Sequence, residues 1–196
     1  GIEQDTIGGY NSYIESQKNN NVKVTTVLFD DKYEMVTNRE DIKNIKELTN
    51  ETYYVRGCTA LYDAIGKTIK KLDKEVKDNK VLFIITTDGL ENASKEYNRS
   101  QIKELIEGHS NWEFMYIGAD IDSYSEGSSI GIKRDNISSY KKDRKGVDTL
   151  LIIKAKDDKV LRPQKNNRHS RATAVGGCEP CCTVGVVYLG QRGQEL

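Results

Sequence analysis

The chain has little proline, no excess charge of either sign and no long apolar run. Only two of its 196 residues are proline, which argues against a disordered or linker-dominated chain. Lysine plus arginine number 30 and aspartate plus glutamate number 30, a balance that disfavours proteins built to bind nucleic acid or an anionic membrane. The longest clean apolar runs, such as 81–85, fall far short of the ~18 residues that cross a bilayer. We therefore expect a globular domain with a well-solvated surface.

The start of the chain also lacks the features of a leader. It opens with Gly1-Ile2-Glu3, without an initiator methionine, a basic segment or an apolar segment, so no signal peptide is predicted. Cys58 is the only cysteine before Cys178, which is typical of cytoplasmic proteins. We expect a cytoplasmic location, and the absent methionine suggests a sequence cut from a longer gene.

Composition changes sharply near residue 163. No lysine follows Lys165, whereas three of the four cysteines lie beyond it. The shift predicts a main domain over 1–162 and a tail of uncertain order over 163–196. A disordered tail and a segment of foreign origin, from a fusion or a shifted reading frame, both fit this pattern.

The tail cysteines form half of a zinc-binding pattern. Cys178 and Cys181 have the CxxC spacing, with Cys182 adjacent and His169 nearby. However, neighbouring cysteines do not easily reach one tetrahedral ion, and a second CxxC is missing. Free thiols are the main expectation for these residues, and zinc binding is the alternative.

Strand and helix patterns alternate through the main domain. Asn98 and Gln101 form a capping box before one of the helices. Strands separated by helices predict an α/β fold with a parallel sheet covered on both faces, whose ligands gather at the carboxyl ends of the strands. The predicted strands are 22–29, 33–36, 81–86 and 112–117, and the predicted helices are one around 7–14, one over 60–78 and one from 98.

Two loops carry side chains that suit a metal ion. Thr59 precedes the 60–78 helix, and Asp88 follows the buried strand 81–86. Hydroxyl and carboxylate oxygens are hard donors that prefer Mg²⁺, Mn²⁺ or Ca²⁺ to zinc. Taken singly, Thr59 is explained as a helix N-cap and Asp88-Gly89 as a turn. Taken together in this order, the two features no longer look independent of each other.

Five segments in order resemble the von Willebrand factor A-type (vWA) family, in particular its small intracellular bacterial and phage members, including those of tellurium-resistance-type operons. The resemblance is good to about residue 125 and fades between 125 and 160. It implies a doubly wound, mostly parallel sheet with a metal-ion-dependent adhesion site (MIDAS), and non-catalytic binding of a partner protein's acidic side chain through Mg²⁺ or Mn²⁺. The segments are Asp5-Thr6-Ile7-Gly8-Gly9-Tyr10-Asn11, Val27-Leu28-Phe29-Asp30-Asp31, Gly57-Cys58-Thr59-Ala60-Leu61-Tyr62-Asp63-Ala64-Ile65-Gly66, Ile85-Thr86-Thr87-Asp88-Gly89-Leu90-Glu91-Asn92 and Tyr116-Ile117-Gly118-Ala119.

The chain departs from this family in one respect. The family's site combines an Asp-x-Ser-x-Ser loop after the first strand with a Thr and an Asp. Thr59 and Asp88 match the last two, but Asp-x-Ser-x-Ser occurs nowhere. Because the matching first helix begins near Gly1, we expect the first strand and its motif to lie upstream. The resemblance thus implies an N-terminally truncated domain whose metal binds weakly or not at all.

The missing strand belongs in the middle of the sheet, where its loss would leave unpaired backbone groups on both neighbours. Residues 183–189 have a strand pattern and could fill this gap. The residues after them, 190–194, contain no carboxylate or hydroxyl, so they could not rebuild the metal site.

Two other functions stay open at this point. A metal-assisted hydrolase could use the same sheet edge, although the sequence offers neither a nucleophile–base pair nor a GxxxxGK phosphate loop. A non-functional or chimeric fragment of a vWA protein would explain the missing motif, the absent methionine and the tail. Nucleic-acid binding is a weak option, because the basic stretch over 133–145 is diluted by acidic residues.

Overall fold

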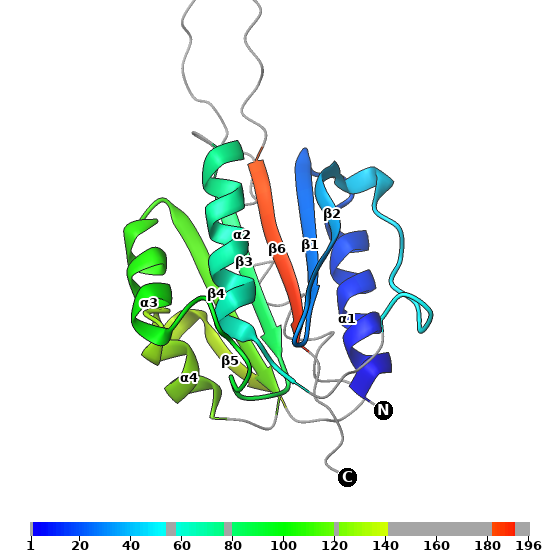
Figure 1. Ribbon diagram of the computed structural model, residues 1–196. Coiled ribbons are helices and arrows are strands. Elements are labelled where there is room, and N and C mark those ends of the chain that lie inside the picture. The colour runs from blue at the N-terminus through cyan, green and yellow to red at the C-terminus, as the bar shows by residue number, and fades with distance from the viewer. Residues whose placement is uncertain (1, 54–57, 77–79, 120–121, 141–181, 191–196) are drawn as a thin grey trace, which may run out of the picture.

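The computed structural model describes residues 2–53, 58–76, 80–119, 122–140 and 182–190. Helices and strands alternate along most of this part of the chain (Figure 1). In order, the elements are α1 Ile2–Gln17, β1 Val22–Phe29, β2 Tyr33–Asp41, the 3-10 turn η1 Ile42–Asn44, α2 Leu61–Glu75, β3 Val81–Thr87, α3 Arg99–Gly108, β4 Trp112–Ala119, α4 Ser123–Ser129, the 3-10 turn η2 Arg134–Asn136, β5 Ile137–Tyr140 and β6 Cys182–Gly190.

The strands form one six-stranded mixed sheet in the order β2-β1-β6-β3-β4-β5. β2 pairs antiparallel with β1 as a hairpin at one edge. All other neighbours pair in parallel, from β1 through β6, β3 and β4 to β5. The carboxyl ends of these five strands therefore lie at the same edge of the sheet, which is the lower edge in Figure 1.

β6 occupies the position where the sequence predicted a gap. Val184 aligns with Val24 of β1 on one side and with Leu82 of β3 on the other. The alternative in which 183–189 supplies the missing strand is thereby confirmed, and the expectation that the sheet lacks a strand at this position is wrong. The boundary predicted between 162 and 163 lies outside the described residues and stays a prediction.

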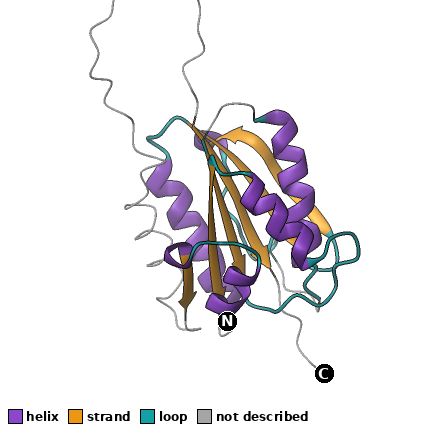
Figure 2. Ribbon diagram, turned by 90° about the vertical axis from the view of Figure 1, so that its left-hand side faces the viewer, coloured by secondary structure: helices purple, strands orange, loops and turns teal. Residues whose placement is uncertain are grey.

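Helices cover both faces of the sheet (Figure 2). On one face, α1 places Tyr10 and Ile14 in a core cluster with Leu82 and Ile84 of β3. On the other face, α2 and α3 bury a second cluster against the alternate side chains of β3, such as Phe83. The sheet is therefore the middle layer of three, as alternating strand and helix patterns predict.

Most predicted elements are confirmed with small shifts at their ends. The long helix runs from Leu61 to Glu75 rather than over 60–78. The capping box of Asn98 and Gln101 is present, with both reciprocal hydrogen bonds. β2 continues to Asp41, well beyond the predicted 33–36, because it alternates half-buried and exposed residues along the edge of the sheet. Within the described residues, no helix combines the length and the apolar character needed to cross a membrane.

Replacing Val184 by proline tests the central position of β6. Proline removes one backbone N–H from a ladder that is paired on both sides, and its ring clashes with the neighbouring backbone. We expect the free energy of unfolding to fall by roughly 3 kcal/mol or more, measured by urea denaturation with the fluorescence of Trp112, the single tryptophan. Gln194→Pro, which lies beyond β6, is the matched control and should change stability little. Equal stability of the two variants would contradict the pairing.

Candidate functional site

The carboxyl ends of β1, β6 and β3 gather two buried carboxylates at one edge of the sheet. Asp30 follows β1 and is 2% exposed, and Asp88 follows β3 and is 5% exposed. Gly190, the last residue of β6, aligns with Phe29 between them. Two strand spacings, about 10 Å, thus separate the ends of β1 and β3. Asp30 was not predicted as a site residue, although the sequence placed it directly after a strand.

Thr59 lies at the same edge, where the chain passes the end of β1 and enters α2. Its side chain is 2% exposed. The N-cap residue of α2 is Ala60, which makes no side-chain capping hydrogen bond, so the explanation of Thr59 as an N-cap is wrong. The Ala60 N–H donates to the Asp30 carbonyl oxygen at 2.7 Å, which holds the Thr59 segment against the end of β1.

Asn92 joins the Thr59 segment to the loop that begins with Asp88. The Thr59 N–H donates to Asn92 Oδ1 at 2.9 Å. In return, the Asn92 N–H donates to the Thr59 carbonyl oxygen at 3.0 Å. This reciprocal pair fixes the loop before α2 against the loop after β3. The structure therefore brings together the two segments that carry the predicted metal ligands.

The Glu91 carboxylate accepts a backbone N–H in the first turn of α2, where the N-cap residue Ala60 provides no capping side chain. One carboxylate oxygen, Oε2, accepts from the Tyr62 N–H at 2.9 Å and from Ser94 Oγ at 2.7 Å. The other, Oε1, accepts from the N–H groups of Ala93 and Ser94. A carboxylate is favourable here because the exposed N–H groups of a helix start carry partial positive charge. Glu91 thus binds the β3 loop to the first turn of α2.

Asp63, in the first turn of α2, forms a second set of hydrogen bonds between this helix and the segment after β3. Its carboxylate accepts the N–H groups of Lys95, Glu96 and Tyr97 at 2.8–2.9 Å. Burial raises the pKa of this carboxyl, but the three backbone N–H groups and nearby Lys67 lower it more, and the net pKa lies below the usual 3.8. The ionised form of Asp63 is therefore the one that holds residues 95–97 in place.

The turn after β3 is closed by a threonine. Thr87 Oγ1 donates to the Gly89 carbonyl oxygen at 2.9 Å and accepts from the Gly89 N–H at 3.3 Å. The turn predicted at Asp88-Gly89 therefore exists and has this support. Thr86 adds a buried hydroxyl near the same end of β3, and the part of the chain that the structure describes gives that oxygen no hydrogen-bond partner.

The oxygen atoms at this edge are of the type that hard cations bind, but they are too few to complete the coordination of such an ion. Thr59 supplies a hydroxyl, and Asp30 and Asp88 supply carboxylates, which suit Mg²⁺ or Mn²⁺. Among the described residues, no group of three or more His, Cys, Asp or Glu side chains is placed to hold a metal ion. A cation at this edge would need further oxygen ligands from water or from another molecule.

Of the three predicted tail zinc ligands, the structure describes the backbone of Cys182 alone. Cys178 and Cys181 lie outside the described residues. Cys182 begins β6, so its backbone lies at the amino end of the strand and away from Asp88. Zinc binding by these three cysteines stays a prediction.

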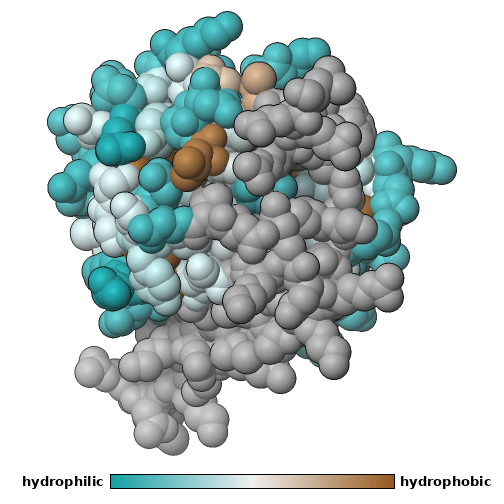
Figure 3. Space-filling view, turned by 90° about the horizontal axis from the view of Figure 1, so that it is seen from below, coloured by the Kyte–Doolittle hydropathy of each residue, from teal (hydrophilic) through white to brown (hydrophobic). Residues whose placement is uncertain are grey.

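Figure 3 looks onto the carboxyl edge of the sheet. Most described side chains visible there are hydrophilic, with few hydrophobic ones among them. Leu90, two residues after Asp88, is 54% exposed, and Cys58, next to Thr59, is also exposed. The buried carboxylates are thus accompanied by side chains that an approaching molecule can touch.

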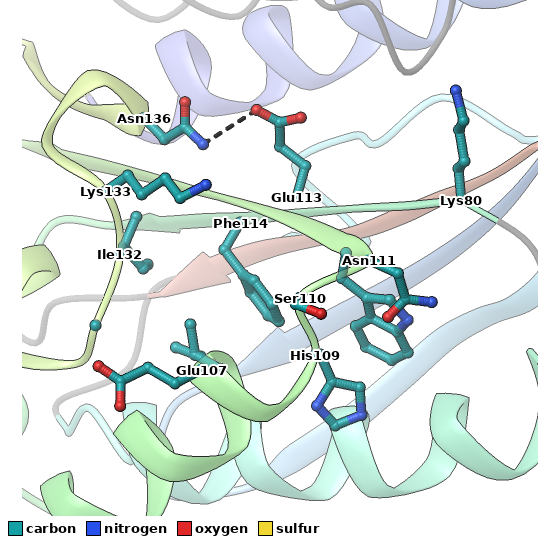
Figure 4. Close-up of a pocket in the computed structure, with 13 residues that line it drawn as sticks. Lys80, Glu107, His109, Ser110, Asn111, Glu113, Phe114, Ile132, Lys133 and Asn136 are labelled. Carbon is teal, nitrogen blue, oxygen red and sulfur yellow. Dashed lines mark hydrogen bonds between the residues drawn. The ribbon is translucent and has the colours of Figure 1, made fainter.

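A separate pocket opens at the opposite edge of the sheet (Figure 4). It has a volume of about 540 Å³ and lies between the end of α3, the start of β4 and the segment before β5. Lys80 and Lys133 line it together with Glu113, which accepts a hydrogen bond from Asn136 at 3.1 Å. It contains neither Thr59 nor Asp88, and its charges of both signs do not favour one class of ligand.

Comparison with protein-family models, curated proteins and solved structures finds no match to this chain. The vWA resemblance therefore rests on the sequence motifs alone and stays an expectation.

Substituting Asp63 by asparagine tests how the loop 95–97 is held. We expect a loss of about 1.5–3 kcal/mol in the free energy of unfolding at neutral pH, typical of hydrogen bonds to a charged group. Because the pKa of Asp63 is lowered in the folded state, its stabilising effect is complete above the unfolded pKa. The effect is lost as the pH falls through the folded pKa.

The difference between wild type and Asp63→Asn should therefore shrink in acid, measured by urea denaturation over a pH series. Asp31→Asn, which also removes one carboxylate but at an exposed position, is the control for the loss of charge alone. A difference that stays constant into acid would contradict the role of the ionised carboxylate.

Proposed function

We propose that this chain is a protein-binding module of vWA type. It recognises an acidic side chain of a partner protein through Mg²⁺ or Mn²⁺ at the carboxyl edge of the sheet, without catalysis. The observation that carries this proposal is the meeting of the Thr59 and Asp88 loops beside the end of β1, joined by the reciprocal hydrogen bonds of Asn92.

The arrangement of the sheet supports the proposal. An antiparallel hairpin at one edge, a run of parallel strands and helices on both faces agree with the doubly wound sheet that the motifs imply. In open sheets of this kind, ligands bind outside the carboxyl ends of the strands. Thr59 and Asp88 lie at that edge, and each belongs to a different segment.

A metal ion held by only a few protein ligands keeps open coordination positions, which a carboxylate of a partner can fill. Mg²⁺ keeps octahedral coordination and is usually held by one or two protein carboxylates together with water or a ligand. An ion beside Thr59 and Asp88 would retain positions that a partner's Asp or Glu can occupy. We propose that exposed Leu90 lies beside the bound partner, and that the ion binds weakly until the partner's carboxylate arrives.

Calorimetric titration with Mn²⁺ and with Mg²⁺ alone tests the site. We expect weak binding by the wild-type chain, reduced at least tenfold in Asp88→Asn and less strongly in Thr59→Ala, because a carboxylate contributes charge as well as an oxygen. Adding acetate, the simplest carboxylate, should strengthen Mn²⁺ binding by wild type but not by Asp88→Asn.

Asp31→Asn is the matched control, since it removes an exposed carboxylate next to buried Asp30. It should bind metal as wild type does. Unfolding curves measured without metal show whether each variant is folded. Metal binding that is equal in folded Asp88→Asn and in wild type would overturn the proposed site.

A further inference from the structure

The strand in the middle of the sheet comes from the far end of the described chain. β6 pairs with β1 over 22–29 and with β3 over 81–86, in parallel on both sides. β1 and β3 make no pairing with each other in the sheet order. The two halves of the sheet are therefore joined through β6, and the position between β1 and β3 is a slot for one extended segment.

Backbone groups define this slot. Each ladder consists of N–H and C=O groups that any segment without proline can supply. Specificity then comes from which side chains alternate toward the two faces. Residues 182–190 of a second copy have the same sequence as those of the first, so they meet both requirements equally well.

The covalent connection does not decide which copy supplies the strand. Residues 141–181 separate the end of β5 from the start of β6, which is 41 residues of chain. A chain of this length can extend to at most about 140 Å. The direct path from the end of β5 to the start of β6 in one copy is only about three strand spacings across and about 30 Å back along a strand. The connection is therefore long enough to reach a neighbouring copy.

We propose that the slot between β1 and β3 also accepts residues 182–190 from a second copy of this chain, giving a strand-exchanged dimer. In this dimer each sheet keeps the order β2-β1-β6-β3-β4-β5 and each copy donates β6 to the other. This inference is independent of the metal site and uses the pairing of β6 together with the number of residues between β5 and β6.

Chain concentration decides between the two arrangements. Because 41 residues tether β6 to its own slot, β6 meets that slot at an effective concentration on the order of 1 mM. Refolding well below this concentration therefore favours the monomer, and refolding close to it favours exchange. A dimer once formed persists on dilution, because release of β6 breaks the ladders on both of its sides at once.

Refolding the full chain from denaturant at low and at high concentration tests the proposal. We expect a monomer after dilute refolding and a dimer fraction after concentrated refolding, measured by light scattering on a sizing column. The dimer should survive dilution for much longer than the time of the measurement.

A disulfide reports which copy supplies β6. Lys23 aligns with Thr183 of β6, so Lys23→Cys with Thr183→Cys, in a background with the native cysteines replaced by serine, places two thiols within bonding range. Oxidation should link two chains in the dimer fraction and close a loop within one chain in the monomer. Denaturing gels without reductant distinguish these products.

The matched control keeps Lys23→Cys and moves the second cysteine to Asp41 of β2, which also aligns with Lys23. Since β1 and β2 form a hairpin, this disulfide should stay within one chain in both fractions. Two results would overturn the proposal. One is a wild-type chain that refolds only as a monomer at high concentration, and the other is a dimer whose 23–183 disulfide stays within a single chain.

Discussion

The architecture of this protein depends on the backbone pairing of β6 with both β1 and β3. Without a strand in this position, each neighbour would present a buried row of N–H and C=O groups, and each unpaired group costs about 1–3 kcal/mol. The pairing also makes one continuous surface on each face of the sheet, against which α1 packs on one side and α2 and α3 on the other. Sheet, helices and candidate site all require this central strand.

The candidate site is held together by contacts between segments that are about thirty residues apart. Asn92 connects to Thr59, Glu91 to Tyr62 and Asp63 to residues 95–97. These bonds place the segment after β3 against the start of α2. The Ala60 N–H, at the start of α2, also donates to the carbonyl oxygen of Asp30 at the end of β1. The position of the Thr59 segment relative to the Asp88 loop is therefore set by surrounding amides and carboxylates.

Local patterns were sufficient to predict most of the fold. The apolar run 81–86, the helical spacing before Glu75 and the capping box at Asn98 depend on neighbours in sequence, and each appears in the structure. The anchoring roles of Glu91 and Asn92 were missed, because a carboxylate or amide that caps a distant helix has the same local signature as any polar loop residue. Asp30 was missed for a related reason, since only the strand order shows that β1 and β3 end at the same edge.

The late position of β6 in the chain also constrains how the protein is made. At about 5–20 residues per second, a ribosome needs roughly 5–20 s to progress from the end of β3 to the end of β6. During that interval β1 and β3 are complete but lack their common partner, and their unpaired edges can bind other strands. Nascent chains should therefore be more prone to aggregation than the finished protein, and a chaperone that shields strand edges would have its largest effect before residue 190 emerges.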